Sequence, residues 1–143
     1  MGYKQWIVIV IEMVFLGIGT WFDVKEQKLP VPFLNIFIVL AAAINLMLGL
    51  QNLWSSFLGA VVGSLFLMIA WLSKEAIGYG DGWVLMILGI LEGAAGILQI
   101  LTGAFFLSGV YGLWKLIGLK GKRGETMPFV PFLLIARLGV LVL

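Results

Sequence analysis

Two aspartates are the residues of this 143-residue chain best suited to acid–base chemistry, because Asp23 and Asp81 are its only Asp residues. The chain has no Cys and no His. Their absence excludes disulfides, thiol catalysis, a Ser-His-Asp triad and a zinc site built on imidazole or thiolate. We therefore expect chemistry based on carboxylates, with no cofactor and no metal ion.

Two carboxyl groups that approach closely form a general acid–base pair. They cannot both ionise easily, so one keeps a proton near neutral pH while the other stays charged. In an aspartic peptidase the ionised group takes a proton from water, the water attacks the scissile carbonyl, and the protonated group hydrogen-bonds the developing oxyanion. The sequence leaves open which of Asp23 and Asp81 would have which role.

Asp23 follows the first apolar run, where a membrane-crossing helix would end. A negative charge at a helix C-terminus is disfavoured by the helix dipole, by about 0.3–1 kcal/mol. Local helix stability therefore does not explain Asp23. The alternative is a solvated residue in a polar loop that also holds Lys25, Glu26 and Lys28.

Asp81 lies in the run Gly78-Tyr79-Gly80-Asp81-Gly82. Its three glycines permit backbone conformations closed to other residues and a close approach of the chain to a substrate. The alternative role is a helix N-cap, since Asp is a preferred cap and an apolar helix is expected just after it.

The elements that must position these aspartates are membrane helices. Hydrophobic residues make up 62% of the chain, charged residues 11%, and the mean hydropathy is +1.14, which is too apolar for a water-soluble globule. We expect one all-α membrane bundle over residues 1–143 with about six transmembrane helices. The predicted spans are Trp6–Phe22, Val31–Leu50, Leu53–Leu72, Trp83–Leu91, Ala94–Leu116 and Pro128–Val142.

The basic residues are distributed unevenly between the loops on the two sides. Lys4 alone lies on one side, and Arg137 lies within the last span. The other side holds Lys25, Lys28, Lys74, Lys115, Lys120, Lys122 and Arg123. This bias predicts an N-terminus outside the cell and both aspartates at the cytoplasmic face. A net charge of +2 placed in this way gives no indication of nucleic-acid binding.

Three segments of the chain resemble motifs of the type IV prepilin peptidase family, which belongs to the Gly-x-Gly-Asp aspartic membrane peptidases. The segment from Asp23 to Pro30, Asp-Val-Lys-Glu-Gln-Lys-Leu-Pro, resembles the first catalytic aspartate with its basic loop. Gly78 to Asp81 resembles the second. The segment from Met127 to Phe132, Met-Pro-Phe-Val-Pro-Phe, resembles the family's Pro-Phe-Gly-Pro-Phe. The order and spacing agree over essentially the whole chain.

The resemblance implies a catalytic pair, Asp23 and Asp81, that removes the leader of prepilin or pseudopilin precursors at the cytoplasmic face of a prokaryotic cell membrane. It also implies supporting roles for the motif residues Gly78, Gly80, Lys28, Pro30, Pro128 and Pro131. The chain is similar to the short form of the family, without the cysteine-motif domain linked to methylation, so we expect cleavage without N-methylation. The expected partners are the precursor and membrane lipid, and the oligomeric state is left open.

Three positions depart from the family pattern. Val31 stands where the family usually has Asn, Trp83 where a basic residue often follows the second aspartate, and Val130 where the last motif normally has Gly. These changes leave both aspartates in place. They bear on substrate contacts and leader preference.

Glu12 and Arg137 lie near the middle of the first and last predicted spans. Because buried charges in a bilayer are costly unless they are paired, one hypothesis is a structural ion pair between them. The alternative is a protonated Glu12 and an Arg137 that extends outward. The Gly-xxx-Gly spacings Gly59–Gly63 and Gly89–Gly93 predict close packing of helices inside the bundle.

A function of another class also fits the sequence. In a small proton- or cation-coupled transporter, the same two carboxylates would bind the transported ion. Two features favour the peptidase, since both aspartates are expected at one membrane face and Glu12 is the one acid placed in the middle of a span.

Overall fold

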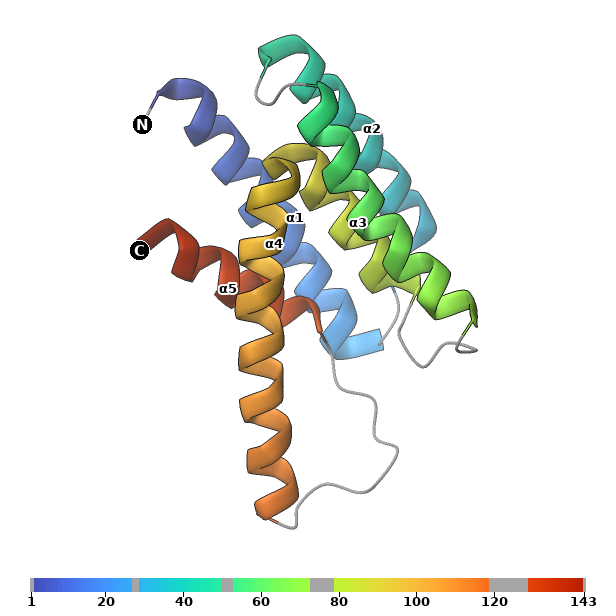
Figure 1. Ribbon diagram of the computed structural model, residues 1–143, viewed down its shortest axis with the longest axis vertical. Helices are drawn as coiled ribbons and strands as arrows, with labels where there is room; N and C mark the ends of the chain where they lie inside the picture. The colour runs from blue at the N-terminus through green and yellow to red at the C-terminus, as the bar shows by residue number, and fades with distance from the viewer. Residues whose placement is uncertain (1, 27–28, 50–52, 73–78, 119–128, 143) are drawn as a thin grey trace.

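The computed structural model describes residues 2–26, 29–49, 53–72, 79–118 and 129–142. They form five helices: α1 (Tyr3–Glu26), α2 (Val31–Leu48), α3 (Leu53–Leu72), α4 (Tyr79–Ile117) and α5 (Val130–Val142) (Figure 1). Within these residues there is no β-strand. The predicted all-α membrane bundle is confirmed: α1 to α4 are long and apolar enough to cross a membrane, and α5 is a shorter apolar helix.

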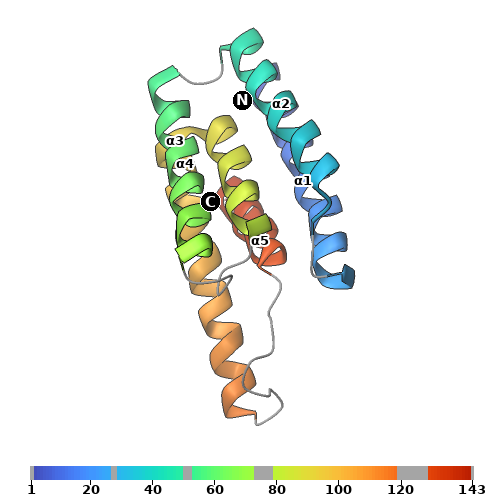
Figure 2. The ribbon, with the colours of Figure 1, turned by 90° about the vertical axis from the view of Figure 1, so that its right-hand side faces the viewer.

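Helix α4 contains the fourth and fifth predicted spans. At Gly93 the backbone leaves the helical conformation, with φ 78° and ψ −179°. Figures 1 and 2 show that the chain turns back at this level, so the yellow first half and the orange second half run in opposite directions. This backbone region is essentially restricted to glycine. The predicted boundary between Leu91 and Ala94 therefore coincides with the observed reversal.

Two serines of α3 bind the backbone groups that the reversal separates. In a continuous helix the N–H of Ala94 would bond the C=O of Ile90. Ser56 Oγ donates to the Ile90 carbonyl oxygen at 3.1 Å, and Ser55 Oγ accepts from the Ala94 N–H at 3.3 Å. Asn45 of α2 adds a 2.7 Å bond to Ser56 Oγ. Such partners are required where a helix breaks away from water.

Glycines allow α3 to lie directly against the first half of α4. A Cβ on Gly59 would meet the backbone of Gly89, and one on Gly63 would meet the backbone of Met86. The Gly59–Gly63 spacing therefore serves packing inside the bundle, as predicted, whereas in the second pair Gly89 packs in this way and Gly93 forms the reversal. Through this contact α3 supports the half of α4 that begins with the Gly-Asp motif.

Helix α1 is longer than the predicted span Trp6–Phe22 and continues to Glu26. Asp23, Lys25 and Glu26, expected in a loop, therefore lie in its last turns. An aromatic cluster of Phe15, Phe33 and Phe37, with ring centroids 4.8–5.4 Å apart, joins α1 to α2.

Candidate active site

Asp23 is a buried carboxylate in the last turns of α1, with 9% of the residue exposed. Its Oδ2 accepts a hydrogen bond from the backbone N–H of Val130 at 3.1 Å, and the N–H of Phe129 also acts on the carboxylate. These amides belong to the start of α5, where backbone N–H groups lack partners within the helix and the dipole favours a negative charge. The solvated-loop alternative for Asp23 is therefore wrong.

Asp81 is the third residue of α4, in its first turn. Because the helix already begins at Tyr79, Asp81 is inside it and is not the N-cap that the alternative interpretation supposed. Asp81 lies near enough to Asp23 for the negative charge of Asp23 to interact with its carboxyl group. The structure thus brings the two aspartates to the same end of the bundle. Among the described residues, neither has an ion-pair partner.

Leu29 fills the space between the segments that carry the aspartates. A Cβ on Gly80 would lie 3.1 Å from Leu29 Cδ1, and a Cβ on Gly19 would lie 3.8 Å from Leu29 Cδ2. The same position at Gly19 would lie 3.4 Å from Val130 Cγ1. Glycine at positions 19 and 80 therefore lets α1, α4 and α5 converge around one leucine.

The predicted supporting residues fall into two groups. Pro30 is the N-cap of α2, and its carbonyl oxygen accepts from the Leu34 N–H at 3.2 Å. Pro131 is the second residue of α5, where a missing N–H costs nothing. Gly80 packs against Leu29. The other three residues with predicted supporting roles, Gly78, Lys28 and Pro128, lie outside the described residues.

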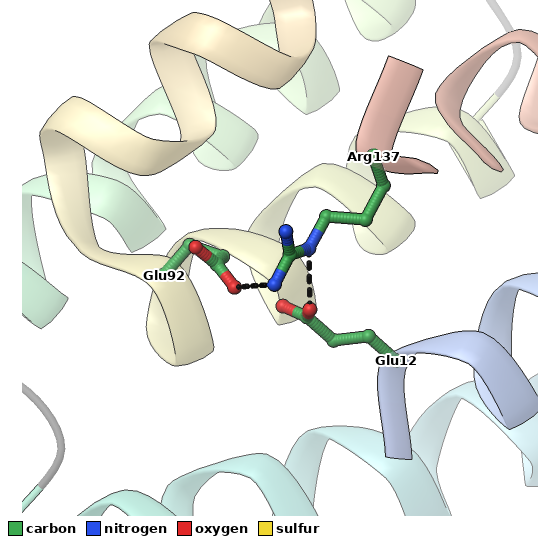
Figure 3. A network of polar contacts seen from close by, with 3 residues as sticks. All are labelled: Glu12, Glu92 and Arg137. Atoms are coloured by element: carbon green, nitrogen blue, oxygen red, sulfur yellow. Dashed lines mark hydrogen bonds and ion pairs between the residues drawn. The ribbon is translucent and has the colours of Figure 1, made fainter. Parts of the chain in front are cut away.

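Three ionisable side chains meet deeper in the bundle (Figure 3). Arg137 Nε donates to Glu12 Oε2 at 2.6 Å, so of the two alternatives for these residues the structure has the one in which they pair. Arg137 Nη2 also donates to Glu92 Oε1 at 2.8 Å. Glu92 falls between the predicted spans Trp83–Leu91 and Ala94–Leu116, so Glu12 was expected to be the one acid in the middle of a span. This expectation was wrong, because Glu92 reaches the depth of Glu12 at the reversal of α4.

Two other polar groups near the aspartates could not be recognised from the sequence. The Val130 N–H is a backbone donor that any residue except proline would supply. The hydroxyl of Thr20, one turn before Asp23, is buried and has no hydrogen-bond partner among the described residues. The periodicity of α1 would have placed Thr20 on the side of Asp23, but only the fold shows that its hydroxyl is buried.

Comparison with protein families gives a match to the type IV leader peptidase family over residues 10–113. The chain belongs to this family. The match includes both aspartates, and the expectation drawn from the three sequence motifs is confirmed at the level of the family. Family membership agrees with the apolar helical bundle, since the family is membrane-bound.

The chain is also similar to the prepilin leader peptidase/N-methyltransferase of Dichelobacter nodosus. The two are 38% identical over 124 residues, a match that covers 80% of this chain and 41% of the relative. The chain thus spans about two fifths of the length of that protein. No solved structure matches the chain.

Val130, which replaces the glycine of the family's last motif, packs beside Gly19 of α1. Val130 is fully buried, and its Cγ1 lies against Gly19. Because Gly19 has no side chain, the valine side chain has room there while the Val130 N–H bonds Asp23 at 3.1 Å. The departure from the glycine of the family pattern therefore leaves the backbone contact at the site intact.

Proposed function

We propose that this protein is a membrane aspartic endopeptidase that removes the leader of prepilin or pseudopilin precursors, with Asp23 and Asp81 as the catalytic pair. The observation that carries the proposal is the convergence of the two aspartates at one end of the bundle in a member of the leader peptidase family. The name of the Dichelobacter nodosus relative supports the substrate class.

The contacts of the two aspartates suggest how the roles are divided. Burial disfavours the ionised form of Asp23, and the backbone N–H donors at the start of α5 oppose this effect. Asp81 lies beside this charge, and among the described residues it has no hydrogen-bond partner for its side chain. We therefore assign Asp23 as the base and Asp81 as the protonated acid.

In the proposed reaction, Asp23 takes a proton from a water molecule while the water oxygen attacks the scissile carbonyl carbon. Asp81 donates a hydrogen bond and then its proton to the carbonyl oxygen, so a neutral gem-diol forms. As the C–N bond breaks, the proton on Asp23 passes to the leaving nitrogen. A proton of the diol returns to Asp81, which leaves a carboxylic acid product and the starting state of the pair.

The location belongs to the same proposal. The excess of Lys and Arg at the connections near Asp23 and Asp81 favours a cytoplasmic position for the site and an outside N-terminus in a prokaryotic cell membrane. There the site would meet a leader beside the apolar helix of the precursor, with membrane lipid around the bundle.

A cleavage assay tests the proposal. The purified protein in liposomes is incubated with a prepilin that carries its leader, and the products are identified by mass spectrometry. We expect Asp81→Asn to lower the cleavage rate by about 10²- to 10⁴-fold, because general acid–base catalysis contributes an effect of this size. Glu26→Gln removes an exposed carboxylate of α1 and is the control, with unchanged cleavage expected.

The same liposomes distinguish the transporter. If the wild-type protein does not cut the precursor but moves protons or cations across the bilayer, and Asp81→Asn stops this flux, the peptidase proposal is wrong. Cleavage that Asp81→Asn leaves intact would also contradict it.

A further inference from the structure

Two helices of the bundle each carry a pair of acids at the same spacing. Glu12 and Asp23 of α1 are eleven residues apart, and so are Asp81 and Glu92 of α4. Eleven residues correspond to about three helical turns and about 16 Å, so both acids of each pair lie on one face of their helix. The equal spacing allows the two helices to match acid against acid at two levels.

The two helices are arranged so that the levels do match. Helix α1 runs toward Asp23, and the first half of α4 runs from Asp81 toward the reversal at Gly93, in the opposite direction (Figures 1 and 2). Glu12 and Glu92 meet at one level through Arg137 (Figure 3). Asp23 and Asp81 lie at the other level, near enough for the charge of Asp23 to act on the Asp81 carboxyl group.

Helix α5 connects the two levels, because it packs against both α1 and α4. Arg137 binds Glu12 at 2.6 Å and Glu92 at 2.8 Å, while Val130, two turns earlier in α5, binds Asp23 at 3.1 Å. The planar guanidinium group offers donors in a fixed fork, so the two bonds fix the relative position of the two glutamates.

We propose that Arg137 is a positioning residue that sets the register between α1 and the first half of α4, and thereby places Asp81 opposite Asp23. This inference rests on the proposed function of the two aspartates. Arg137 acts through Glu12 and Glu92 and does not touch the reacting groups.

The triad of Glu12, Glu92 and Arg137 constrains the register because it lies away from solvent. Glu12 is 0% exposed, Arg137 is 6% exposed, and the Glu92 side chain is 19% exposed. A shift of α4 by one residue moves its side chains by about 1.5 Å along the axis and turns them by about 100°. It would separate Glu92 from Arg137 and leave the partly buried Glu92 carboxylate without its ion-pair partner. A misplacement of about 1 Å at a reacting group can lower a rate by about 10²-fold.

The experiment measures register and catalysis in one protein. Since the chain has no Cys, spin labels can be attached at Val24→Cys and Tyr79→Cys, exposed positions beside the aspartates that leave both intact. The label-to-label distance distribution, kcat and KM are measured with the triad unchanged, with Glu92→Met and with Arg137→Lys. Lys4→Gln, which removes a cation of α1 outside the triad, is the matched control.

With Glu92→Met we expect a broadened or shifted distance distribution and a kcat lowered by about 10- to 100-fold with little change in KM, because the acids are displaced while the substrate surface remains. Arg137→Lys keeps the charge but not the fork, so we expect an intermediate effect. Lys4→Gln should match the unchanged triad. Glu92→Gln, with the same shape and a smaller perturbation, replaces Glu92→Met if that variant does not fold.

A folded Glu92 variant with an unchanged distance distribution and unchanged kcat would overturn the inference, even if its melting temperature fell. Failure of the proposed function would look different. In that case the protein with the triad intact would not cleave the precursor, while the distances would still report whether the triad sets the register.

Discussion

At the scale of single residues, the contact between Asp23 and the start of α5 explains the position of the carboxylate. Asp23 is unfavourably placed with respect to the dipole of its own helix and favourably placed with respect to that of α5, whose Val130 N–H it accepts. A hydrogen bond to a charged group contributes about 1.5–3 kcal/mol. The residue that seemed unexplained by α1 alone is therefore explained by the helix packed against it.

Val130→Pro tests this contact, because it removes the N–H while position 130, at the first turn of α5, accepts proline. We expect cleavage to slow by about 10- to 100-fold, from the loss of a hydrogen bond to a charged group. Without this donor the ionised form of Asp23 is less favoured, so the acid limb of the pH–rate profile should move to higher pH.

Val130→Ala is the matched control for Val130→Pro. It removes the buried side chain but keeps the N–H, so it should lower thermal stability while the acid limb of the pH–rate profile stays in place. Equal pH profiles for the two variants would show that the Val130 N–H does not act on Asp23.

The sequence indicated Asp23, Asp81 and the Glu12–Arg137 pair because each is a charged residue in an apolar chain. The Val130 N–H could not be predicted, since a backbone amide carries no residue-specific signal. Glu92 was missed for a related reason, because an acid next to a glycine between two apolar runs has the pattern of a loop.

At the scale of elements, the reversal at Gly93 determines where the site lies. It ends the first half of α4 at the depth of the triad, and Ser55 and Ser56 bind the backbone groups it separates. Hydropathy predicted the boundary between the two halves. It could not predict the angle between them, which depends on the conformation of one glycine and on two serines in another helix.

Gly93→Ala tests the reversal. Because φ 78° with ψ −179° is a conformation essentially reserved for glycine, we expect a loss of about 1–3 kcal/mol in the free energy of unfolding. The measurement is the thermal unfolding of the purified protein in detergent.

Gly109→Ala is the control in the same helix, since a Cβ at Gly109 would meet open space. Its stability should be unchanged or slightly higher, because alanine favours the helix by up to about 1 kcal/mol. A Gly93→Ala protein as stable as Gly109→Ala would contradict the strained reversal.

At the scale of the whole molecule, composition predicted the all-α membrane bundle, and the three motifs predicted the family to which the chain belongs. Both follow from average properties or from short segments. The ends of the helices were predicted less well, as α1 shows, because a helix continues into polar residues when its last turn packs against another element.

The expected orientation in the membrane has its own test. Since the chain has no Cys, single cysteines can be introduced at Lys4 and at Glu26, the two exposed ends of α1. We expect a membrane-impermeant maleimide to label position 4 in intact spheroplasts and position 26 only after the membrane is opened. The reverse pattern would place the site outside the cytoplasm.

The central claim is that Asp23 and Asp81 act as one unit in peptide hydrolysis. Its most direct test is the single-turnover rate of leader removal by Asp23→Asn, Asp81→Asn and the double variant, each shown to be folded. Because the effects of residues that act together are not additive, we expect all three rates to fall to the same low level. A folded variant of either aspartate that cleaves the precursor at the wild-type rate would contradict it.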